Sequence, residues 1–245
     1  MLIVTVCVVG CRVISTTDRV ANRMGAAPPA PPSPSPSRSP SPPPPADCRK
    51  AKCLALTFDD GPGPDTPRLL DMLKRRAVRA TFFVLGRNAA AEPAVLRRMV
   101  ADYHEIANHS YSHANLAKLS TREIRREIQR SQEIVFRATG QRPKVMRPPY
   151  GATNARVNRA VGLPEIMWRG DTLDWLHRKA SSVRRAVLKL AKRGAVILVH
   201  DIHPSTVDAM PATIDTLLRR GYTLVTVSEL YRGKRLVPGR AYAWD

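Results

Sequence analysis

The chain has 245 residues, 43% of them hydrophobic, so it can bury the core of one large domain or of two small ones. Lysine and arginine total 40 against 20 aspartate and glutamate, a formal net charge of +20. This charge indicates anionic surroundings, or else an arginine-rich solvated surface. Nucleic-acid binding is not favoured, because the basic residues lie on expected helix faces without interleaved aromatic residues or a recognised motif.

Residues 1–25 are interpreted as an export segment. Met1–Gly10 is apolar but short, whereas a membrane-spanning helix needs about 20 apolar residues, so it is more typical of a signal peptide. It lacks the usual basic residue at its start, which suggests a true start further upstream. Val8-Val9-Gly10-Cys11 resembles a bacterial lipobox, in which Cys11 would be lipidated; simple signal cleavage or a short anchor is the alternative.

Residues 26–47 are rich in proline, serine and alanine and predict an extended polyproline spacer. A spacer after an export signal suggests a domain held away from a membrane or threaded into a cell wall. Cys48 and Cys53 stand at the entry to the first expected strand, and a disulfide between them would hold the start of the domain in an oxidising compartment. A zinc site is less favoured, because no second cysteine pair follows within the domain.

From Cys53 onward, short apolar runs alternate with helical patterns. Strands are expected at Cys53–Phe58, Ala80–Leu85, Val145–Met146, Glu165–Trp168, Ala195–Val199 and Thr223–Val227. Helices are expected at Pro67–Arg76, Pro93–Asp102, Thr121–Thr139, Asn154–Val161, Ser182–Lys192 and Pro211–Arg220. The longest has capping-box spacing at Ser120 and Glu123, and Gly140 at its end. The alternation predicts a parallel α/β fold, and a small barrel rather than a two-domain enzyme.

The first chemical motif is Thr57-Phe58-Asp59-Asp60-Gly61-Pro62, where two adjacent carboxylates follow an apolar run. Like charges side by side repel, and a divalent cation can offset them while leaving one carboxylate free for acid–base chemistry. A solvated turn is the alternative. His109 and His113 have a metal-ligand spacing that would place both imidazoles on one side of a helical turn. With Asp60 they would give an open site with two nitrogens and one oxygen.

Three further motifs also follow apolar runs. They are Arg147-Pro148-Pro149-Tyr150-Gly151, Asp171-Thr172-Leu173-Asp174-Trp175 and Leu198-Val199-His200-Asp201. Individually the first would be an ordinary proline-rich loop, and His200 a core histidine. In a parallel α/β barrel, however, the carboxyl ends of all strands meet at one face, so these residues are expected to converge there.

At these residues the chain resembles the carbohydrate esterase family 4 polysaccharide deacetylases, or NodB-homology domain. The five motifs match in order: Thr57-Phe58-Asp59-Asp60-Gly61-Pro62, His109-Ser110-x-x-His113, Arg147-Pro148-Pro149-Tyr150, Asp171-x-x-Asp174-Trp175 and Leu198-x-His200-Asp201. The resemblance implies a distorted, incomplete (β/α) barrel. We therefore expect the catalytic domain at residues 48–234 and a C-terminal tail at 235–245.

The resemblance also implies roles. Asp60, His109 and His113 would hold a divalent metal, most often zinc, with Co²⁺, Mn²⁺ or Ni²⁺ as alternatives. Asp59 would be the general base for a metal-bound water that attacks the acetamide carbonyl, and His200 would protonate the leaving amine. An acyl-enzyme route through the neighbouring serines is disfavoured.

The remaining implied roles are supporting ones. The Tyr150 backbone N–H would stabilise the oxyanion together with the metal. Arg147 would orient Asp59, and Asp171 would tune His200. Trp175 and Leu198 would form the wall of the pocket for the acetyl methyl group.

The expected protein is an exported, monomeric N-deacetylase that acts on cell-wall glycan, with N-acetylglucosamine of peptidoglycan as the first candidate substrate. Its basic surface would contact anionic wall polymers, and Cys11 would provide a lipid anchor if it is modified. Chitooligosaccharides and acetylated xylan are alternative substrates, because the motifs do not separate them. A catalytically silent wall-binding module is the alternative from another class.

Overall fold

The computed structural model describes residues 2–3, 10 and 44–243. The lipidation candidate Cys11 and most of the expected export and spacer segments therefore lie outside the described residues. The folded unit spans Pro42–Asp245. Among the residues described, no helix combines the length and the apolar character that crossing a bilayer requires.

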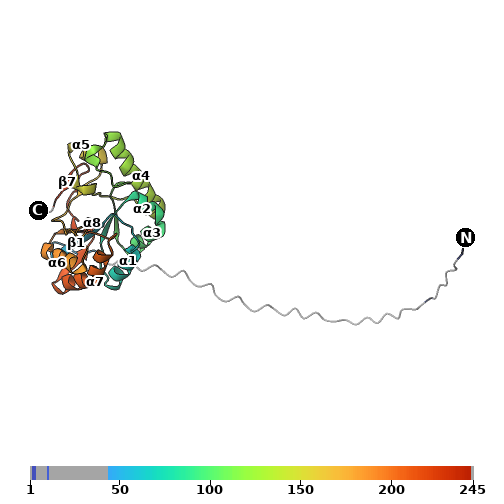
Figure 1. Ribbon diagram of the computed structural model, residues 1–245, viewed down its shortest axis with the longest axis horizontal. Helices are drawn as coiled ribbons and strands as arrows, with labels where there is room; N and C mark the ends of the chain where they lie inside the picture. Colours follow the sequence, from blue (N-terminus) through green and yellow to red (C-terminus); the bar gives the residue numbers. More distant parts are fainter. Residues whose placement is uncertain (1, 4–9, 11–43, 244–245) are drawn as a thin grey trace. The chain divides into compact units, whose positions relative to one another are not determined.

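The folded unit alternates strands with helices (Figure 1). The strands are β1 Lys52–Asp59, β2 Thr81–Val84, β3 Glu105–Asn108, β4 Glu165–Ile166, β5 Val196–His200, β6 Tyr222–Val225 and β7 Ala241–Tyr242. The helices are α1 Thr66–Arg75, α2 Gly86–Ala91, α3 Pro93–Ala101, α4 Thr121–Thr139, α5 Ala155–Val161, α6 Ala180–Leu190, α7 Pro204–Arg219 and α8 Val227–Leu230. Two short 3-10 turns lie at Leu116–Lys118 and Pro149–Gly151.

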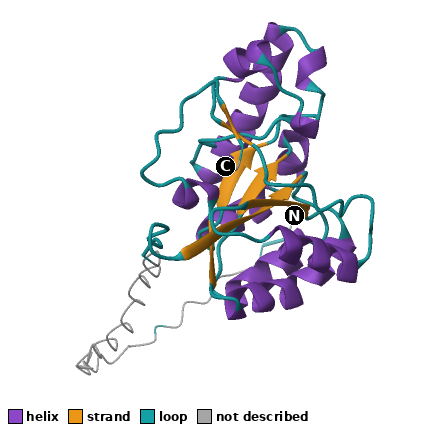
Figure 2. Cartoon of the chain, turned by 90° about the vertical axis from the view of Figure 1, so that its left-hand side faces the viewer, coloured by secondary structure: helices purple, strands orange, loops and turns teal. Residues whose placement is uncertain are grey.

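The strands form a distorted (β/α) barrel in which every pairing is parallel. The main sheet has the order β3-β2-β1-β5, with β6 also paired to β1, while β4 pairs with β7. Single bridges then continue the ring from β3 back to β5: Asn108 to Met146, Met146 to Glu165, and Asp171 to Leu198. Figure 2 shows the strands at the centre and the helices around them. The barrel is irregular because this side closes through single bridges rather than full strands.

Most expected elements are present, but the short helices α2 and α8 were not expected, and there are further differences. Val145–Met146 supplies one bridge residue rather than a strand. The pattern missed β3, because its four residues include the polar Glu105 and Asn108 and form no apolar run. Helix α7 begins at Pro204, and Pro211, which was expected to start it, lies inside it. The expected tail 235–245 contains β7, which pairs in parallel with β4, and the Tyr242 carbonyl accepts from the Met167 N–H at 2.9 Å, so this strand belongs to the folded unit.

The longest helix, α4, confirms the local signals in its sequence. The Ser120 side chain accepts from the backbone of Glu123, and the Glu123 side chain accepts in return, so both parts of the capping box are present. Gly140 ends the helix with φ of 73°, a left-handed conformation that costs glycine little. Ile124, Ile128 and Val135 are buried on one face.

Two apolar clusters of the core lie on opposite faces of the strands. Leu54, Leu56 and Phe58 of β1 pack outward with the helices, whereas Ala55 packs inward with Phe83 of β2. Because side chains alternate along a strand, Thr57 and Asp59 share the inward face with Ala55. On β5 the same alternation groups Leu198 and His200 with the inward Val196. The period of the strands thus directs the polar groups of both strand ends into the barrel.

Candidate active site and metal centre

A buried ion pair lies at the carboxyl end of β1. Arg147 is fully buried and donates from Nη1 to Asp59 Oδ1 at 2.7 Å and to Thr57 Oγ1 at 2.9 Å. Its Nε donates to the Ile166 carbonyl at 2.9 Å, and its guanidinium lies 4.0 Å from the ring centre of Phe83. Bonds to several elements hold the cation in one orientation, so Arg147 holds the carboxylate of Asp59 in place.

Asp60, His109 and His113 come together next to this pair. Asp60 Oδ1 lies 3.4 Å from His109 Nε2 and 3.2 Å from His113 Nε2. One ligand atom from each of the three residues lies within 4.8 Å of the other two. Asp60 has φ of 72°, which turns the chain directly after β1 and separates its side chain from that of Asp59.

The donor set fits a divalent cation. His109 Nδ1 lies 2.7 Å from the Arg147 carbonyl, which can only accept, so Nδ1 carries the proton and the Nε2 lone pair faces Asp60. Asp60 Oδ1 is a buried oxygen without a hydrogen-bond partner among the described residues. Burial would raise the pKa of Asp60, but the imidazoles of His109, His113 and His200, when they carry protons, lower it to about 2. Burial lowers the pKa of His113 and favours its neutral, ligating form.

Their spacing suggested that the two histidines lie on a helical turn, but they do not. They flank a loop after β3 in which Ser110 and His113 have φ of 66° and 65°. Glu127 of α4 holds this loop by accepting from the backbone N–H groups of Tyr111 and Ser112 at 3.0 and 2.8 Å. The Ser112 hydroxyl also donates to Glu127 at 3.0 Å, and the Ser110 hydroxyl accepts from the His113 N–H at 3.1 Å. Both serines are therefore engaged in holding the loop, which disfavours them as nucleophiles.

The partner of His200 is Asp174, and this corrects the role expected for Asp171. His200 Nδ1 lies 2.8 Å from Asp174 Oδ1, and Asp174 Oδ2 accepts from the His200 N–H at 2.8 Å. Asp171 instead accepts from the Leu173 N–H at 2.8 Å and from Trp175 Nε1 at 3.1 Å. The reason is the turn at Leu173, which has φ of 54° and places Asp174 in the interior with no exposed surface.

The protonation of His200 follows from this pair. Burial alone would lower the pKa of His200, but the hydrogen bond and charge of Asp174, with the charges of Asp59 and Asp60, raise it to about 9. His200 is the register partner of Asp59 on the adjacent strand. A protonated imidazole and a carboxylate thus end two neighbouring strands on the inward face of the barrel, where they can act as an acid and a base.

The three residues expected to contact substrate lie around this centre. Tyr150 is 68% exposed, has φ of 60°, and sets its ring 4.5 Å from that of His113 in an edge-on contact. Trp175 is 47% exposed and is held by its bond to Asp171, whereas Leu198 is buried on β5.

One buried acid near the site was not assigned a role from the sequence. Asp201 is fully buried and accepts from the Thr66 hydroxyl, which itself accepts from the Gly63 N–H at 2.8 Å. A Cβ added to Gly61 would lie 2.4 Å from both carboxyl oxygens of Asp201. Burial raises the pKa of Asp201 to about 7. Asp201 therefore braces the loop that follows Asp60, and only its place beside His200 in the sequence hinted at this.

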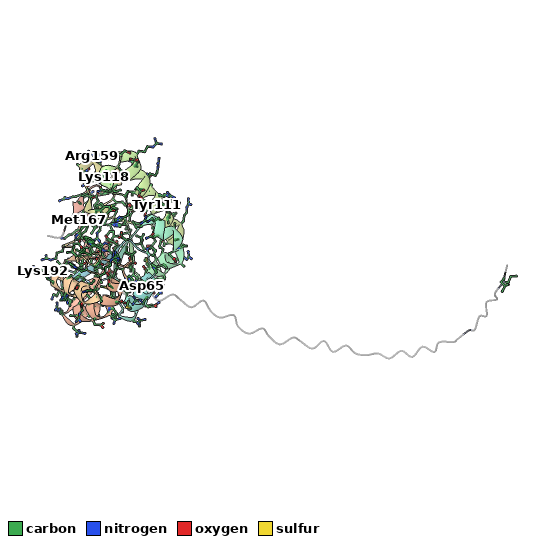
Figure 3. The ribbon with its side chains drawn as sticks, viewed as in Figure 1. Asp65, Tyr111, Lys118, Arg159, Met167 and Lys192 are labelled. Carbon is green, nitrogen blue, oxygen red and sulfur yellow. A yellow bond between two sulfur atoms is a disulfide. The ribbon has the colours of Figure 1, made fainter. Side chains whose placement is uncertain are left out.

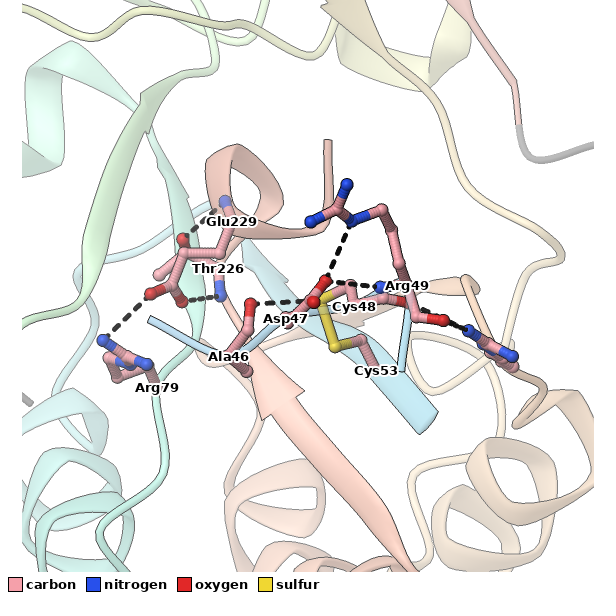
Figure 4. Close-up of a disulfide and its surroundings, with 9 residues drawn as sticks. Ala46, Asp47, Cys48, Arg49, Cys53, Arg79, Thr226 and Glu229 are labelled. Carbon is pink, nitrogen blue, oxygen red and sulfur yellow. Dashed lines mark hydrogen bonds and ion pairs between the residues drawn. A yellow bond between two sulfur atoms is a disulfide. The ribbon is translucent and has the colours of Figure 1, made fainter. Parts of the chain in front are cut away.

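The amino end of the domain is closed by a disulfide between Cys48 and Cys53 (Figure 4). The bond joins the segment before β1 to the second residue of that strand. Arg193 donates to the carbonyls of Cys48 and Arg49 at 3.1 and 2.6 Å. This end of β1 is opposite to the one that bears Asp59.

Comparison with known proteins decides the family. The model of the polysaccharide deacetylase family matches residues 46–164, which include Asp59, Asp60, His109, His113 and Arg147. A peptidoglycan-N-acetylglucosamine deacetylase of Bacillus cereus is 38% identical over 187 residues, which cover 73% of this chain and 68% of that protein. The chain belongs to the polysaccharide deacetylase family.

Two other members of the family share more of their sequence with this chain than the Bacillus cereus protein does. Peptidoglycan-N-acetylglucosamine deacetylase PgdA of Listeria monocytogenes is 45% identical over 192 residues, which cover 78% of the chain. The chain spans 41% of the length of that relative. A solved structure described as T48 deacetylase with substrate is also 45% identical, with a TM-score of 0.79 over 80% of this chain and 99% of that one. This structural similarity agrees with the (β/α) barrel.

Proposed function

We propose that this protein is a metal-dependent hydrolase that removes N-acetyl groups from a cell-wall glycan, with N-acetylglucosamine of peptidoglycan as its substrate. The observation that supports this most directly is the convergence of Asp60, His109 and His113, whose ligand atoms lie within 4.8 Å of one another. Asp59 and His200 lie beside them on adjacent strands. The names of the relatives in Bacillus cereus and Listeria support the choice of substrate.

A divalent cation held by Asp60, His109 and His113, zinc or else Co²⁺, Mn²⁺ or Ni²⁺, would supply a Lewis acid for the acetamide carbonyl and lower the pKa of water. Two neutral nitrogens and one carboxylate oxygen are typical of catalytic zinc sites. The Nδ1–H of His109 is fixed by the Arg147 carbonyl, so its Nε2 is oriented before a cation arrives.

The side chains around this centre would divide the work of amide hydrolysis. Asp59, oriented by Arg147, accepts a proton from the attacking water as its oxygen bonds to the carbonyl carbon. His200 donates its Nε2 proton to the amine nitrogen as the carbon–nitrogen bond breaks, and acetate leaves. Asp174 keeps His200 protonated for this step. The Tyr150 N–H stabilises the oxyanion, and Leu198 with Trp175 encloses the acetyl methyl group.

The surroundings of the domain complete the proposal. Residues 1–25 direct export, residues 26–47 form a spacer, and the catalytic domain starts at about residue 48 and includes the last strand. A net charge of +20 keeps the protein near anionic wall polymers. The protein acts as a monomer at the outer face of the cell.

The test is acetate release from peptidoglycan, chitooligosaccharides and acetylxylan measured side by side, before and after chelation and with each metal restored. We expect activity on peptidoglycan, its loss on chelation, and its return with a divalent cation. Activity on chitooligosaccharides or acetylxylan but not on peptidoglycan would contradict the proposed substrate.

Asp59→Asn separates an enzyme from a wall-binding module. The variant keeps the size of the side chain but removes the base, and is expected to reduce kcat by 10²-fold or more, about the contribution of a positioned base. Metal binding should be retained, because Asp59 is not among the three ligands. No acetate release from the unaltered, metal-loaded protein on any substrate would favour the binding module.

A further inference from the structure

A second cavity lies at the end of the barrel opposite the candidate active site. Its volume is about 1130 Å³, and its lining includes Cys53, near the start of β1, and Gly194, just before β5. The same two strands end at Asp59 and His200. Since strand residues advance about 3.3 Å each, roughly 20 Å of β1 separates this cavity from the catalytic groups.

The lining of this cavity is strongly basic. It contains two acids, Asp47 and Glu229, and six cations: Arg49, Arg193, Arg232, Lys234, Arg235 and Arg240. Asp47 pairs with Arg49 at 3.2 Å, and Glu229 pairs with Arg79 at 2.9 Å (Figure 4). Within residues 44–243, the other five cations form no ion pair with a carboxylate. Their charge is therefore available to a ligand.

The walls of the cavity are held in place by bonds that leave these charges exposed. The disulfide and the two bonds from Arg193 to backbone carbonyls fix one wall. On the other wall, the Tyr242 hydroxyl accepts from the Val237 N–H at 2.7 Å, and Arg240 lies 5.5 Å from the Tyr242 ring centre. A preorganised site loses less entropy when it binds a ligand.

Basic side chains also lie elsewhere on the folded unit. Lys118, Arg159 and Lys192, for example, lie at the edge of the folded unit (Figure 3). A hollow of about 840 Å³ is also lined by four arginines, Arg122, Arg125, Arg126 and Arg130, but all of them come from helix α4 rather than from facing walls. The cavity is distinguished by cations that converge from three segments of the chain.

We propose that this cavity binds phosphodiester groups of an anionic polymer chain. Four of the five available cations are arginines, whose planar donors match phosphate oxygens in pairs. A concave site of this volume accepts a flexible chain, whereas a flat bilayer surface cannot fill it. The spacer enters the domain at Pro45–Asp47, which also line the cavity, so the polymer would be bound where the tether arrives. This binding site acts independently of the deacetylase chemistry.

The experiment measures binding of a soluble poly(glycerol phosphate) oligomer to the full chain by calorimetry. The test variant replaces Arg232, Lys234 and Arg240 with glutamine, and the matched control replaces Arg122, Arg125 and Arg126 with glutamine. Both variants lose three positive charges from exposed positions, so an effect of net charge alone is equal in the two. We expect the test variant to weaken binding at least 10-fold and the control less than 3-fold. Affinity should fall steeply between about 50 and 200 mM salt, less so in the test variant.

Three results would overturn the proposal. They are no binding of the oligomer by the unaltered chain, equal weakening in both variants, or preferential binding of vesicles rich in anionic lipid. Hydrogen exchange of the unaltered chain is a second measurement, and added oligomer should protect segment 229–242 and leave 109–113 unchanged. Because neither measurement uses acetate release, failure of this proposal is distinguishable from failure of the proposed function.

Discussion

His200 and Asp174 share two hydrogen bonds: Nδ1 of the imidazole lies 2.8 Å from one carboxylate oxygen, and the backbone N–H donates to the other at 2.8 Å. Asp174 also accepts from the Thr206 hydroxyl at 2.7 Å, so its position is fixed from α7 as well as from β5. One carboxylate thus sets both the orientation and the charge of the candidate acid.

Replacing Asp174 with asparagine should move the alkaline limb of activity downward. The pKa of His200 is about 9 with Asp174 in place, and burial alone would lower it below its ordinary value of 6.5. The acid should therefore lose its proton well below pH 9 in the variant. The pH profile of kcat/KM for acetate release measures this. Asp171→Asn is the control: Asp171 contacts Trp175 rather than His200, so the alkaline limb of this variant should stay in place. An alkaline limb that does not move in Asp174→Asn would contradict the assignment of Asp174 as the partner of His200.

Arg147→Met should destabilise the protein by about 3–5 kcal/mol, because it leaves the carboxylate of Asp59 buried without a cation. Combining it with Asp59→Asn should recover part of that loss. The bonds of Arg147 to Thr57 and Ile166 are lost in the single and double variants alike, so the difference reports the ion pair. Urea unfolding of the metal-free proteins provides the measurement, and strict additivity would show that the pair is not coupled.

Gly61→Ala should disturb the metal ligands, because its Cβ would lie 2.4 Å from the carboxyl oxygens of Asp201. We expect a loss of about 1–3 kcal/mol in stability and weaker metal binding, since Asp60 precedes Gly61. Gly63→Ala is a graded control, because its Cβ would meet Ile202 at 3.1 Å, and it should cost less. In an Asp201→Ala background the effect of Gly61→Ala should shrink. An equal penalty in both backgrounds would exclude this contact as the cause.

His104 should make the protein acid-sensitive. Its Nδ1 accepts from the Ala80 N–H at 3.2 Å, and burial lowers its pKa from 6.5 to about 4. Because the folded pKa is depressed, this contribution is complete above pH 6.5 and is lost as the pH falls through about 4, by up to about 3 kcal/mol.

The variant His104→Asn keeps an acceptor for Ala80 but does not titrate. Its unfolding free energy, measured in chelator so that metal release does not contribute, should depend less on pH between 6.5 and 4 than that of the unaltered chain. Parallel pH curves for the two proteins would rule out His104 as the sensitive group.

Features that depend on neighbouring residues along the chain could be predicted without a structure. The ends of α4 follow from Ser120, Glu123 and Gly140, whose bonds are local. The alternation of strands and helices was predictable because the spacing of apolar residues within a segment indicates whether it forms a strand or a helix. The motif residues on the other strands could be named because they stand at the end of such a run, whereas His109 and His113 were named from their spacing alone.

Which side chains meet depends on how distant segments of the chain pack. The choice of Asp174 over Asp171 rests on a turn at Leu173, and the His109–His113 loop is held by Glu127 of another element. The strand β3 forms because β2 and Met146 pair with it, although its own sequence has no apolar run. The cations of the basic cavity come from segments far apart in the chain. These outcomes depend on the packing of distant segments, which local patterns do not encode.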